Sequence, residues 1–327
     1  MARFLCFGEI LLRLSAPSGE LLLQTPSVRT HVGGAEANVA VSLAHFGHDV
    51  RVASTLPNNR LAWSARDELR RYGVNTDLIR FAPKGRMGLY FLTPGAGQRA
   101  ADIVYDRAGS AFTEDASGGD WFAAKPDWLH TSGISFAVGA EKIALDAMAE
   151  AKAAGASVSF DSNFRAKLWA DRGVDPRPSL TQAFKSCNVL FADHRDIALI
   201  TGESVASADD AARIAFALSS QLDTLAFTER NVLSADHHEL TGVMFTRSGV
   251  TRTKPHEVSG IVDRIGGGDA FAAGVLHGRA SGWDTQRSLD FAVAAAVLKH
   301  YIAGDFNLST ADDVNFYLSN AGSDVRR

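Results

Sequence analysis

The sequence predicts an α/β fold in which helices cover both faces of a mainly parallel sheet. Short apolar runs rich in β-branched and aromatic residues alternate along the 327 residues with longer stretches of helical periodicity. Strands that alternate with helices are joined by right-handed crossovers, which makes neighbouring strands parallel. A hydrophobic content of 46% is enough to bury a large core. We therefore expect residues 1–327 to form a single domain.

Each expected element follows from its own pattern. Runs of β-forming residues bounded by turn-forming residues predict strands over 4–8, 49–54, 128–132, 157–161, 189–192 and 224–228. Stretches of helical periodicity between them predict helices over 36–46, 60–72, 140–154 and 206–222. A further alanine-rich run from Asp269 to Arg279 also predicts a helix.

Two segments interrupt this alternation. Residues 9–32 and 88–107 alternate apolar and polar side chains, with glycine and proline between them, and show no helical period. Each segment leaves a core element and returns to one. We expect the pair to form a small β-sheet lid on the main domain; the alternative is two long hairpin loops.

Composition and charge exclude several classes of protein. A formal net charge of -4 gives no basic surface for nucleic acid. The longest apolar runs, such as 291–298, are far shorter than the roughly 20 residues that span a bilayer. The chain starts directly with a strand-like run and not with a secretory signal. Cys6 and Cys187 lie in apolar runs typical of buried free thiols, so we expect a reducing cytoplasm.

The most informative segment is a glycine triplet, Gly266, Gly267 and Gly268, followed by Asp269 and the expected helix. A glycine loop that opens a helix binds anions, because free N–H groups and the helix dipole both favour negative charge. Such a loop suits a phosphoryl group in transfer. A carboxylate at position 269 can then accept the proton of an attacking hydroxyl. The alternative is a flexible turn with Asp269 as a helix cap.

This segment resembles a signature of the ribokinase-like (PfkB) carbohydrate kinases, Asp-Thr-x-Gly-Ala-Gly-Asp. Asp263 begins it here, with Arg264 in the threonine place and Gly267 in the alanine place. A second signature of that family, a double glycine leading into a helix with an asparagine one turn in, is similar to Gly33 through Asn38. The two lie about 230 residues apart in the order the family has.

The resemblance covers essentially the whole chain and carries several expectations. It implies a ribokinase-like three-layer fold, ATP and Mg²⁺ as cofactors, and the possibility of a monovalent cation. It implies that Asp269 is the catalytic base, that the glycine triplet holds the developing charge, and that Asn38 binds sugar hydroxyls. Because lid sheets in this family pair between subunits, it also implies a homo-oligomer.

Several further segments look like those of 2-keto-3-deoxygluconate kinases, which phosphorylate the 6-hydroxyl of a keto acid in Entner-Doudoroff and uronate catabolism. These segments are 8–15, 88–91, 105–111, 161–169 and 304–307. A sugar acid carries a carboxylate that a neutral sugar lacks, and the guanidinium fork can donate to both of its oxygens. By this resemblance the sugar-acid pocket is lined by Gly34, Tyr90, Tyr105, Arg107 and Arg165.

Each pocket residue also has a plain structural interpretation. Tyr90 can be a half-buried aromatic of a lid strand, and Arg165 can pair with Asp161. Tyr105 and Arg107 can likewise be lid residues without a ligand.

The chain departs from the family where Asn-x-x-Glu normally helps to hold Mg²⁺. Asp193 and Asp196 occupy those places and keep oxygen ligands, with Asp196 expected to reach the ion through water. Nucleotide contacts are expected from Asp193, Thr228, Gly266 and Gly268. The adenine pocket is expected loosely between Thr228 and Asn307, near Lys299.

Two rival functions remain open. One is a kinase for a neutral sugar such as fructose or ribose, in which Arg107 would matter little. The other is a ligand-binding protein that has lost catalysis, for which the altered Asn-x-x-Glu motif is the only support.

Overall fold

A computed structural model describes residues 1–116, 121 and 125–319. Its large sheet has the order β13-β12-β11-β10-β9-β8-β1-β4-β5, with β14 paired to β12. Seven neighbouring strands are parallel: β1 (Arg3–Phe7), β4 (Asp49–Pro57), β5 (Ile79–Ala82), β8 (Trp128–Ser132), β9 (Ser157–Asp161), β10 (Val189–Phe191) and β11 (Thr224–Ser234). The α/β fold with a central sheet is confirmed.

One edge of this sheet is antiparallel, which the alternation pattern did not predict. Strand β11 continues six residues beyond Thr228 because it pairs with β12 (His237–Thr246) along almost its whole length. Strands β13 (Gly249–Arg252) and β14 (His256–Ser259) then pair with β12. The sheet is therefore mixed and not wholly parallel.

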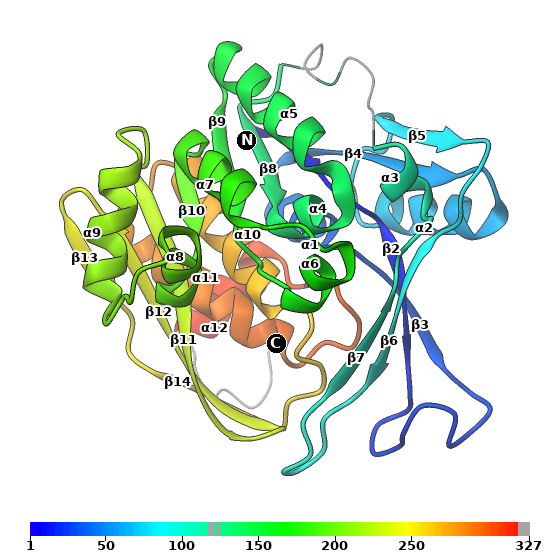
Figure 1. Ribbon diagram of the computed structural model, residues 1–327. Coiled ribbons are helices and arrows are strands. Elements are labelled where there is room, and N and C mark those ends of the chain that lie inside the picture. Colours follow the sequence, from blue (N-terminus) through cyan, green and yellow to red (C-terminus); the bar gives the residue numbers. More distant parts are fainter. Residues whose placement is uncertain (117–120, 122–124, 320–327) are drawn as a thin grey trace.

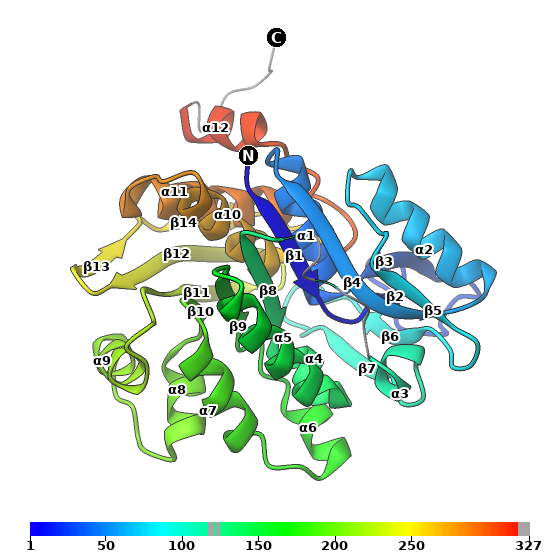
Figure 2. The same cartoon turned by 90° about the horizontal axis from the view of Figure 1, so that it is seen from above.

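Helices cover both faces of the sheet, as Figure 2 shows from above. One layer contains α1 (Ala35–His45), α2 (Arg60–Arg71), α10 (Gly267–Ala280), α11 (Thr285–Lys299) and α12 (Ala311–Ser319). The other contains α4 (Gly133–Ser135), the π-helical turn η2 (Phe136–Ala140), α5 (Glu141–Ala153), α6 (Ala166–Arg172), α7 (Arg177–Ser186), α8 (His194–Thr201) and α9 (Ala208–Leu218). The short α3 (Ala111–Glu114) follows the second sheet. Within the described ranges, no helix combines the length and the apolarity that crossing a membrane requires.

Two hydrophobic cores separate these three layers, and β1 contributes to both. Phe4 and Cys6 face the core beneath α1, α10 and α11, whereas Leu5 and Phe7 face the core beneath α5 and α7. Successive side chains of a strand point to opposite faces, so a strand buried on both sides is apolar throughout. Cys6 and Cys187 are both buried and free, as expected.

A second sheet of four strands projects from the main body (Figure 1). Its order is β3 (Arg29–Gly33), β2 (Leu11–Ser15), β6 (Gly88–Thr93) and β7 (Asp102–Asp106), and we call it the lid sheet. Strands β2 and β6 pair in parallel although their first residues, Leu11 and Gly88, are 77 positions apart in the sequence.

The pairing of β2 with β6 joins the two interrupting segments into one sheet, so the alternative of two separate hairpin loops is wrong.

Candidate active site

The glycine triplet lies where α10 begins, on the side of the sheet where the parallel strands end. Gly266 caps the helix with a φ of 83°, a left-handed conformation that favours glycine. A Cβ on Gly266 would lie 2.0 Å from the carbonyl oxygen of Asp305, and one on Gly267 would lie 2.8 Å from the ring of His300. Both positions require glycine because neighbouring chain segments approach so closely.

Gly268 differs from the other two glycines. A Cβ built there would meet no atom within 4 Å, so open space lies directly over the first turn of α10. The free N–H groups of that turn border this space, and a helix N-terminus attracts anions. The geometry provides room for a phosphoryl group where the sequence predicted one.

Asp269 lies beside this space in the first turn of α10 and is 9% exposed. Asn38 of α1 donates a hydrogen bond of 2.6 Å from Nδ2 to Oδ2 of Asp269. Burial raises the pKa of Asp269 to about 6, although the Asn38 hydrogen bond and the charge of Arg165 act against it. A carboxylate with a pKa close to neutrality is suited to accept and release a proton.

The second glycine pair fixes the start of α1. Gly34 has a φ of 139°, and a Cβ there would lie 2.2 Å from the carbonyl oxygen of Glu9. Glu36 then accepts three hydrogen bonds, from the N–H and Oγ of Ser132 and from Oγ of Ser135. Burial raises the pKa of Glu36 to about 7. These contacts lock α1 against the end of β8 and so position Asn38.

Asp161, at the end of β9, senses the charge of two other carboxylates, those of Asp269 and Asp196. Burial, followed by the negative charge of Asp269, raises the pKa of Asp161 well above its usual range, and the charge of Arg165 opposes this rise. Burial also raises the pKa of Asp196. Arg165 is exposed at the start of α6, where its Nη1 donates to the Phe164 carbonyl at 3.1 Å. The structure thus brings Arg165 toward Asp269 and Asp161 without closing an ion pair.

The lid sheet contributes an aromatic pair. Tyr90 and Tyr105 are opposite each other on β6 and β7, with ring centroids 6.5 Å apart. The hydroxyl of Tyr90 donates to Oδ2 of Asp305 at 2.7 Å, and both residues are buried. Tyr105 is half-buried. The two rings form one face of the lid sheet next to Leu11 and Leu92.

Arg107, which follows β7, is buried in an ion pair that the sequence did not reveal. Its Nε donates to Oε2 of Glu9 at 2.7 Å, and its Nη2 lies 2.5 Å from the same oxygen. Ser110 donates to the other oxygen of Glu9 at 2.6 Å. Glu9 and Arg107 are 98 residues apart in the sequence, and no local pattern connects them.

Arg13 forms a second buried network that sequence reasoning missed. The Arg13 side chain is 1% exposed and donates to both carboxylate oxygens of Asp263 at 3.1 and 2.6 Å, while its Nε lies 3.1 Å from Oδ1 of Asp305. Asp263 also accepts from the N–H groups of Ile265 and Gly304. The network ties β2 of the lid sheet to the loop before the glycine triplet. The only signal in the sequence was a charged residue among the apolar residues of β2.

Asp193 and Asp196 form a capping box at the start of α8. The carboxylate of Asp193 accepts from the N–H groups of Arg195 and Asp196, and the carboxylate of Asp196 accepts from the N–H of Asp193 at 2.9 Å. Asp193 also pairs with the guanidinium of Arg195. In the described part of the chain no three His, Cys, Asp or Glu side chains are grouped as a metal site. The oxygens of Asp193 are therefore used by α8 and Arg195, and Asp196, whose charge acts on Asp161, uses one carboxylate oxygen in the capping box.

Basic residues gather on the side of the triplet that faces β11. Thr228 lies on β11, and Arg230 lies two residues further on, opposite Leu240. Burial lowers the pKa of Arg230, and the positive charges of Arg264 and Arg195 add to this effect. Neither Arg230 nor Arg264 has a carboxylate partner among the residues that the structure describes.

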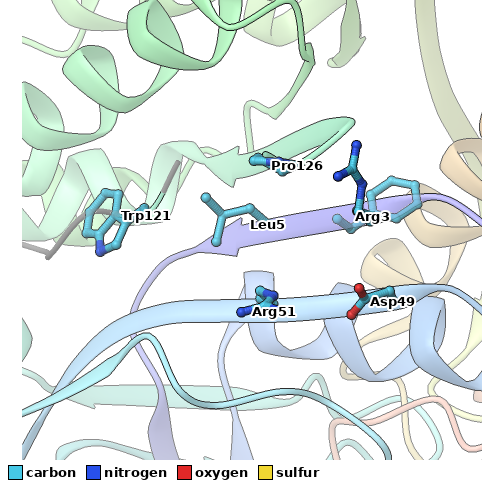
Figure 3. Close-up of a pocket in the computed structure, with 7 residues that line it drawn as sticks. Arg3, Leu5, Asp49, Arg51, Trp121 and Pro126 are labelled. Atoms are coloured by element: carbon cyan, nitrogen blue, oxygen red, sulfur yellow. The ribbon is translucent and has the colours of Figure 1, made fainter. Parts of the chain in front are cut away.

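Two cavities differ in their relation to this site, and the larger one extends to Gly304 and Asp305 beside the triplet. A groove of about 370 Å³ separates the lid sheet from α2 and is lined by Leu12, His31, Glu68 and Tyr72 among others. A second pocket, of about 10 Å³, lies at the amino ends of β1 and β4 between Arg3, Arg51 and Trp121 (Figure 3). Such a volume holds about one water molecule, which excludes a sugar.

The comparison with known families decides the class of protein. The model of the pfkB family carbohydrate kinases matches residues 1–304. The chain belongs to this family.

Several of the similar proteins carry sugar-acid kinase names, and others, at 27% and 28% identity, carry fructokinase names. The chain is 30% identical over its whole length to a 2-dehydro-3-deoxygalactonokinase of Haloferax volcanii, covering 99% of that protein. It is 27% identical to a 2-dehydro-3-deoxygluconokinase of Thermoproteus tenax, with 93% of this chain and 90% of that protein covered. The solved 2-dehydro-3-deoxygluconokinase of Thermotoga maritima superimposes with a TM-score of 0.90 at 35% identity, covering 98% of this chain and 100% of that one. The PfkB kinase described here is therefore similar to enzymes for both sugar-acid epimers.

Proposed function

We propose that this PfkB kinase transfers the γ-phosphoryl group of ATP to the 6-hydroxyl of a 2-keto-3-deoxy sugar acid, with 2-keto-3-deoxygluconate as the first candidate. The observation that carries the proposal is the buried Asp269 beside the open space over Gly268. That arrangement combines a base for a hydroxyl proton with N–H groups for a phosphoryl group.

The proposed step balances in atoms and charge. The substrate hydroxyl loses its proton to the carboxylate of Asp269 as its oxygen forms a bond to the γ-phosphorus, and the bond from that phosphorus to the β,γ-bridging oxygen breaks to release ADP. Asn38 holds the carboxylate in place through its 2.6 Å hydrogen bond. The N–H groups at the start of α10 stabilise the charge that develops on the phosphoryl oxygens.

The residues around the triplet fit Mg²⁺ and nucleotide phosphates. Burial, and then the charges of Asp269 and Asp196, raise the pKa of Asp161, and Mg²⁺ is usually held by one or two carboxylates together with substrate phosphates. When bound, the ion neutralises charge on the phosphates. Arg230 and Arg264 supply positive charge near the triplet, so we expect them to face the nucleotide phosphates along with Thr228. Asp193 is the weakest of the expected nucleotide contacts, because α8 and Arg195 already use its oxygens.

The acidic substrate is supported by the lid sheet and by the relatives. Tyr90 and Tyr105 are opposite each other in the lid sheet, Arg107 follows β7, and Gly34 approaches the main chain of Glu9, the ion-pair partner of Arg107. Arg107 and Arg165 are the proposed partners of the substrate carboxylate. The sugar-acid kinase that is 30% identical over the whole chain supports this class of substrate, whereas the fructokinases, at 27% and 28% identity, match 83% and 81% of the chain.

The test compares initial rates of ADP release from Mg-ATP with five acceptors: 2-keto-3-deoxygluconate, 2-keto-3-deoxygalactonate, gluconate, fructose and ribose. We expect kcat/KM for the keto-deoxy acids to exceed that for the neutral sugars by about 100-fold or more. Phosphorus NMR of the product should show a triplet, because a phosphate on the terminal carbon couples to two protons. Asp269→Asn, purified in the same way, controls for contaminating kinases.

The outcomes separate the rival functions. A higher kcat/KM with fructose or ribose would retain the phosphoryl transfer and reject the acid pocket. No detectable turnover of the unaltered protein with any acceptor would reject the proposed step and favour a ligand-binding role.

A further inference from the structure

Lys299, the last residue of α11, is completely buried. Its Nζ donates to the carbonyl oxygen of Ile302 at 2.9 Å and lies 3.5 Å from the carbonyl oxygen of Asp263. Burying an ammonium group is costly, so a lysine without exposure needs compensating contacts. Both of these contacts are to main-chain oxygens, and the expected position of Lys299 near the adenine gains no support from them.

The two carbonyl groups belong to the two loops that shape the glycine triplet. One loop leads from Asp263 to Gly266, and the other follows α11 from Ile302 to Asp305. The loops are joined by the hydrogen bond from the N–H of Gly304 to Asp263, at 3.0 Å. They touch most closely at Gly266, whose Cβ position would be 2.0 Å from the Asp305 carbonyl oxygen and 3.3 Å from Cε of Lys299.

The surrounding charges keep the ammonium group ionised. Burial lowers the pKa of Lys299 to about 8, while the carboxylates of Asp263, Asp305 and Asp269 raise it and Arg13 lowers it. At neutral pH the group is therefore mostly positive. A positive charge held by main-chain oxygens of two loops is the environment in which proteins also bind K⁺ or Na⁺.

We propose that the ammonium group of Lys299 takes the place of a monovalent cation beneath the glycine triplet. Lys299 is thus a positioning residue: it joins the two loops and holds the start of α10 for phosphoryl transfer. The inference rests on the proposed kinase function and adds to it that turnover needs no free K⁺ or Na⁺.

The first test uses the unaltered protein. Steady-state rates are measured at constant ionic strength in the chloride salts of potassium, sodium, ammonium and tetramethylammonium, the last being too large for a site of this kind. We expect kcat and both KM values to agree within about twofold, since the charge is already present. Activation by K⁺ of about tenfold or more over tetramethylammonium would overturn the proposal.

The second test removes the charge. In tetramethylammonium chloride we expect Lys299→Ala to lower kcat by about 100-fold with a smaller change in KM for the sugar acid, because the triplet is misplaced. Ammonium or K⁺ should restore part of kcat in Lys299→Ala and should also raise its Tm, without either effect on the unaltered protein. Lys142→Ala, at an exposed position of α5, is the matched control and should behave as the unaltered protein in every salt.

These outcomes distinguish the two proposals. Unaltered rates for Lys299→Ala in tetramethylammonium chloride would overturn the role of Lys299 and leave the kinase function intact. If Lys299→Ala does not fold, the cation dependence of the unaltered protein still decides the matter. Absence of turnover in all salts would instead reject the proposed function, and a Tm of the unaltered protein that rises with K⁺ but not with tetramethylammonium would reject the built-in cation.

Discussion

Asp269 lies where the proposed reaction needs a base, but burying its carboxylate lowers the stability of the folded protein. Its folded pKa of about 6 lies above the 3.8 of a free aspartate, so the folded state binds the proton more tightly than the unfolded state does. The folded protein therefore loses stability as the pH rises through about 6. The carboxylate stays buried in spite of this loss of stability because it lies between Asn38 and the glycine triplet, where the proposed reaction needs it.

We predict opposite effects of Asp269→Asn on activity and on stability. Loss of the base should lower kcat by roughly 10²- to 10⁴-fold, while ATP and sugar-acid binding measured by calorimetry stay within a few-fold. Removal of a buried charge should raise the free energy of unfolding at pH 7 by on the order of 2 kcal/mol, measured by urea denaturation. Near-unaltered turnover would show that another group is the base. Asp67→Asn, exposed on α2, is the control.

The pKa of Asp269 also predicts the acid limb of the rate profile. The base must be ionised, so log kcat/KM should fall with unit slope as the pH decreases below about 6. Because kcat/KM reports the free enzyme, a profile that stays flat down to pH 4.5 would mean that the base is a more exposed carboxylate. The measurement is kcat/KM between pH 4.5 and 8 in buffers of constant ionic strength, with the sugar acid ionised throughout.

Arg107→Lys tests the carboxylate partner while keeping the charge that Glu9 needs. Lysine lacks the guanidinium fork, so we expect KM for the sugar acid to rise by about tenfold with little change in kcat. Truncation to alanine would leave Glu9 unpaired and buried, which typically costs about 3–5 kcal/mol and would confuse binding with folding. Arg86→Lys is the matched control, since Arg86 pairs with Asp106 at an exposed position of the same lid sheet. An equal KM in both variants would contradict the assignment.

Among the helices and strands, the predictions were most accurate where a single local sequence pattern determines the element. The bounds of β8 and β9 were predicted to the residue, because each is a short apolar run ending at a polar residue. The glycine triplet and its helix were also predicted, because three glycines beside an aspartate have few structural uses. Strand β11 was predicted to end at Thr228 but continues to Ser234. Its last residues are mostly exposed and are held only by pairing with β12, which the local sequence does not indicate.

The ion pairs of the site could not be predicted in the same way. Arg13 meets Asp263 across 250 residues, and nothing near either residue indicates its partner. Asp193 and Asp196, which occupy the positions of the Asn-x-x-Glu motif, were difficult to interpret for a different reason. Their spacing fits both a metal site and a capping box. The structure shows the capping box, and the metal role of Asp196 stays a prediction.

Two glycines of the triplet should respond differently to alanine. Gly266→Ala meets a main-chain oxygen and a left-handed backbone, so we expect a loss of stability of roughly 1–3 kcal/mol, measured by urea denaturation. Gly268→Ala has space for its methyl group and should fold normally, but the methyl group would enter the proposed phosphate space. We expect KM for ATP to rise about tenfold in Gly268→Ala, with the sugar-acid KM nearly unchanged. An unaltered KM for ATP would place the phosphates elsewhere.

At the scale of the whole molecule, the lid sheet is fastened to the main body by charges. Arg13 reaches Asp263 and Asp305, and Tyr90 reaches Asp305. Lid opening would expose or separate these buried groups, so the closed position has a specific electrostatic basis. We expect closure over the site to exclude water from the transferred phosphoryl group.

The edges of the lid sheet lead to a prediction about assembly. Strands β3 and β7 are its edges, and Val28 and Val104 beside or on them are 41% and 51% exposed. An uncovered edge with exposed apolar residues pairs readily with another chain. We expect a dimer or larger assembly at micromolar concentration by sedimentation velocity, and a shift toward monomer in Val104→Lys. A monomeric unaltered protein would contradict this expectation, and Val174→Lys, exposed outside the lid sheet, is the control.

The parallel pairing of β2 with β6 also constrains how the chain folds. Five elements lie between these two strands in the sequence: β3, α1, β4, α2 and β5. Strands β4 and β5 must join the main sheet before β6 can return to β2. Non-local parallel pairing of this kind is slow to form. The lid sheet should therefore gain protection from amide hydrogen exchange after the strands β1 and β4 during refolding. A newly synthesised chain would pass through a stage with a formed core and an unfinished substrate pocket.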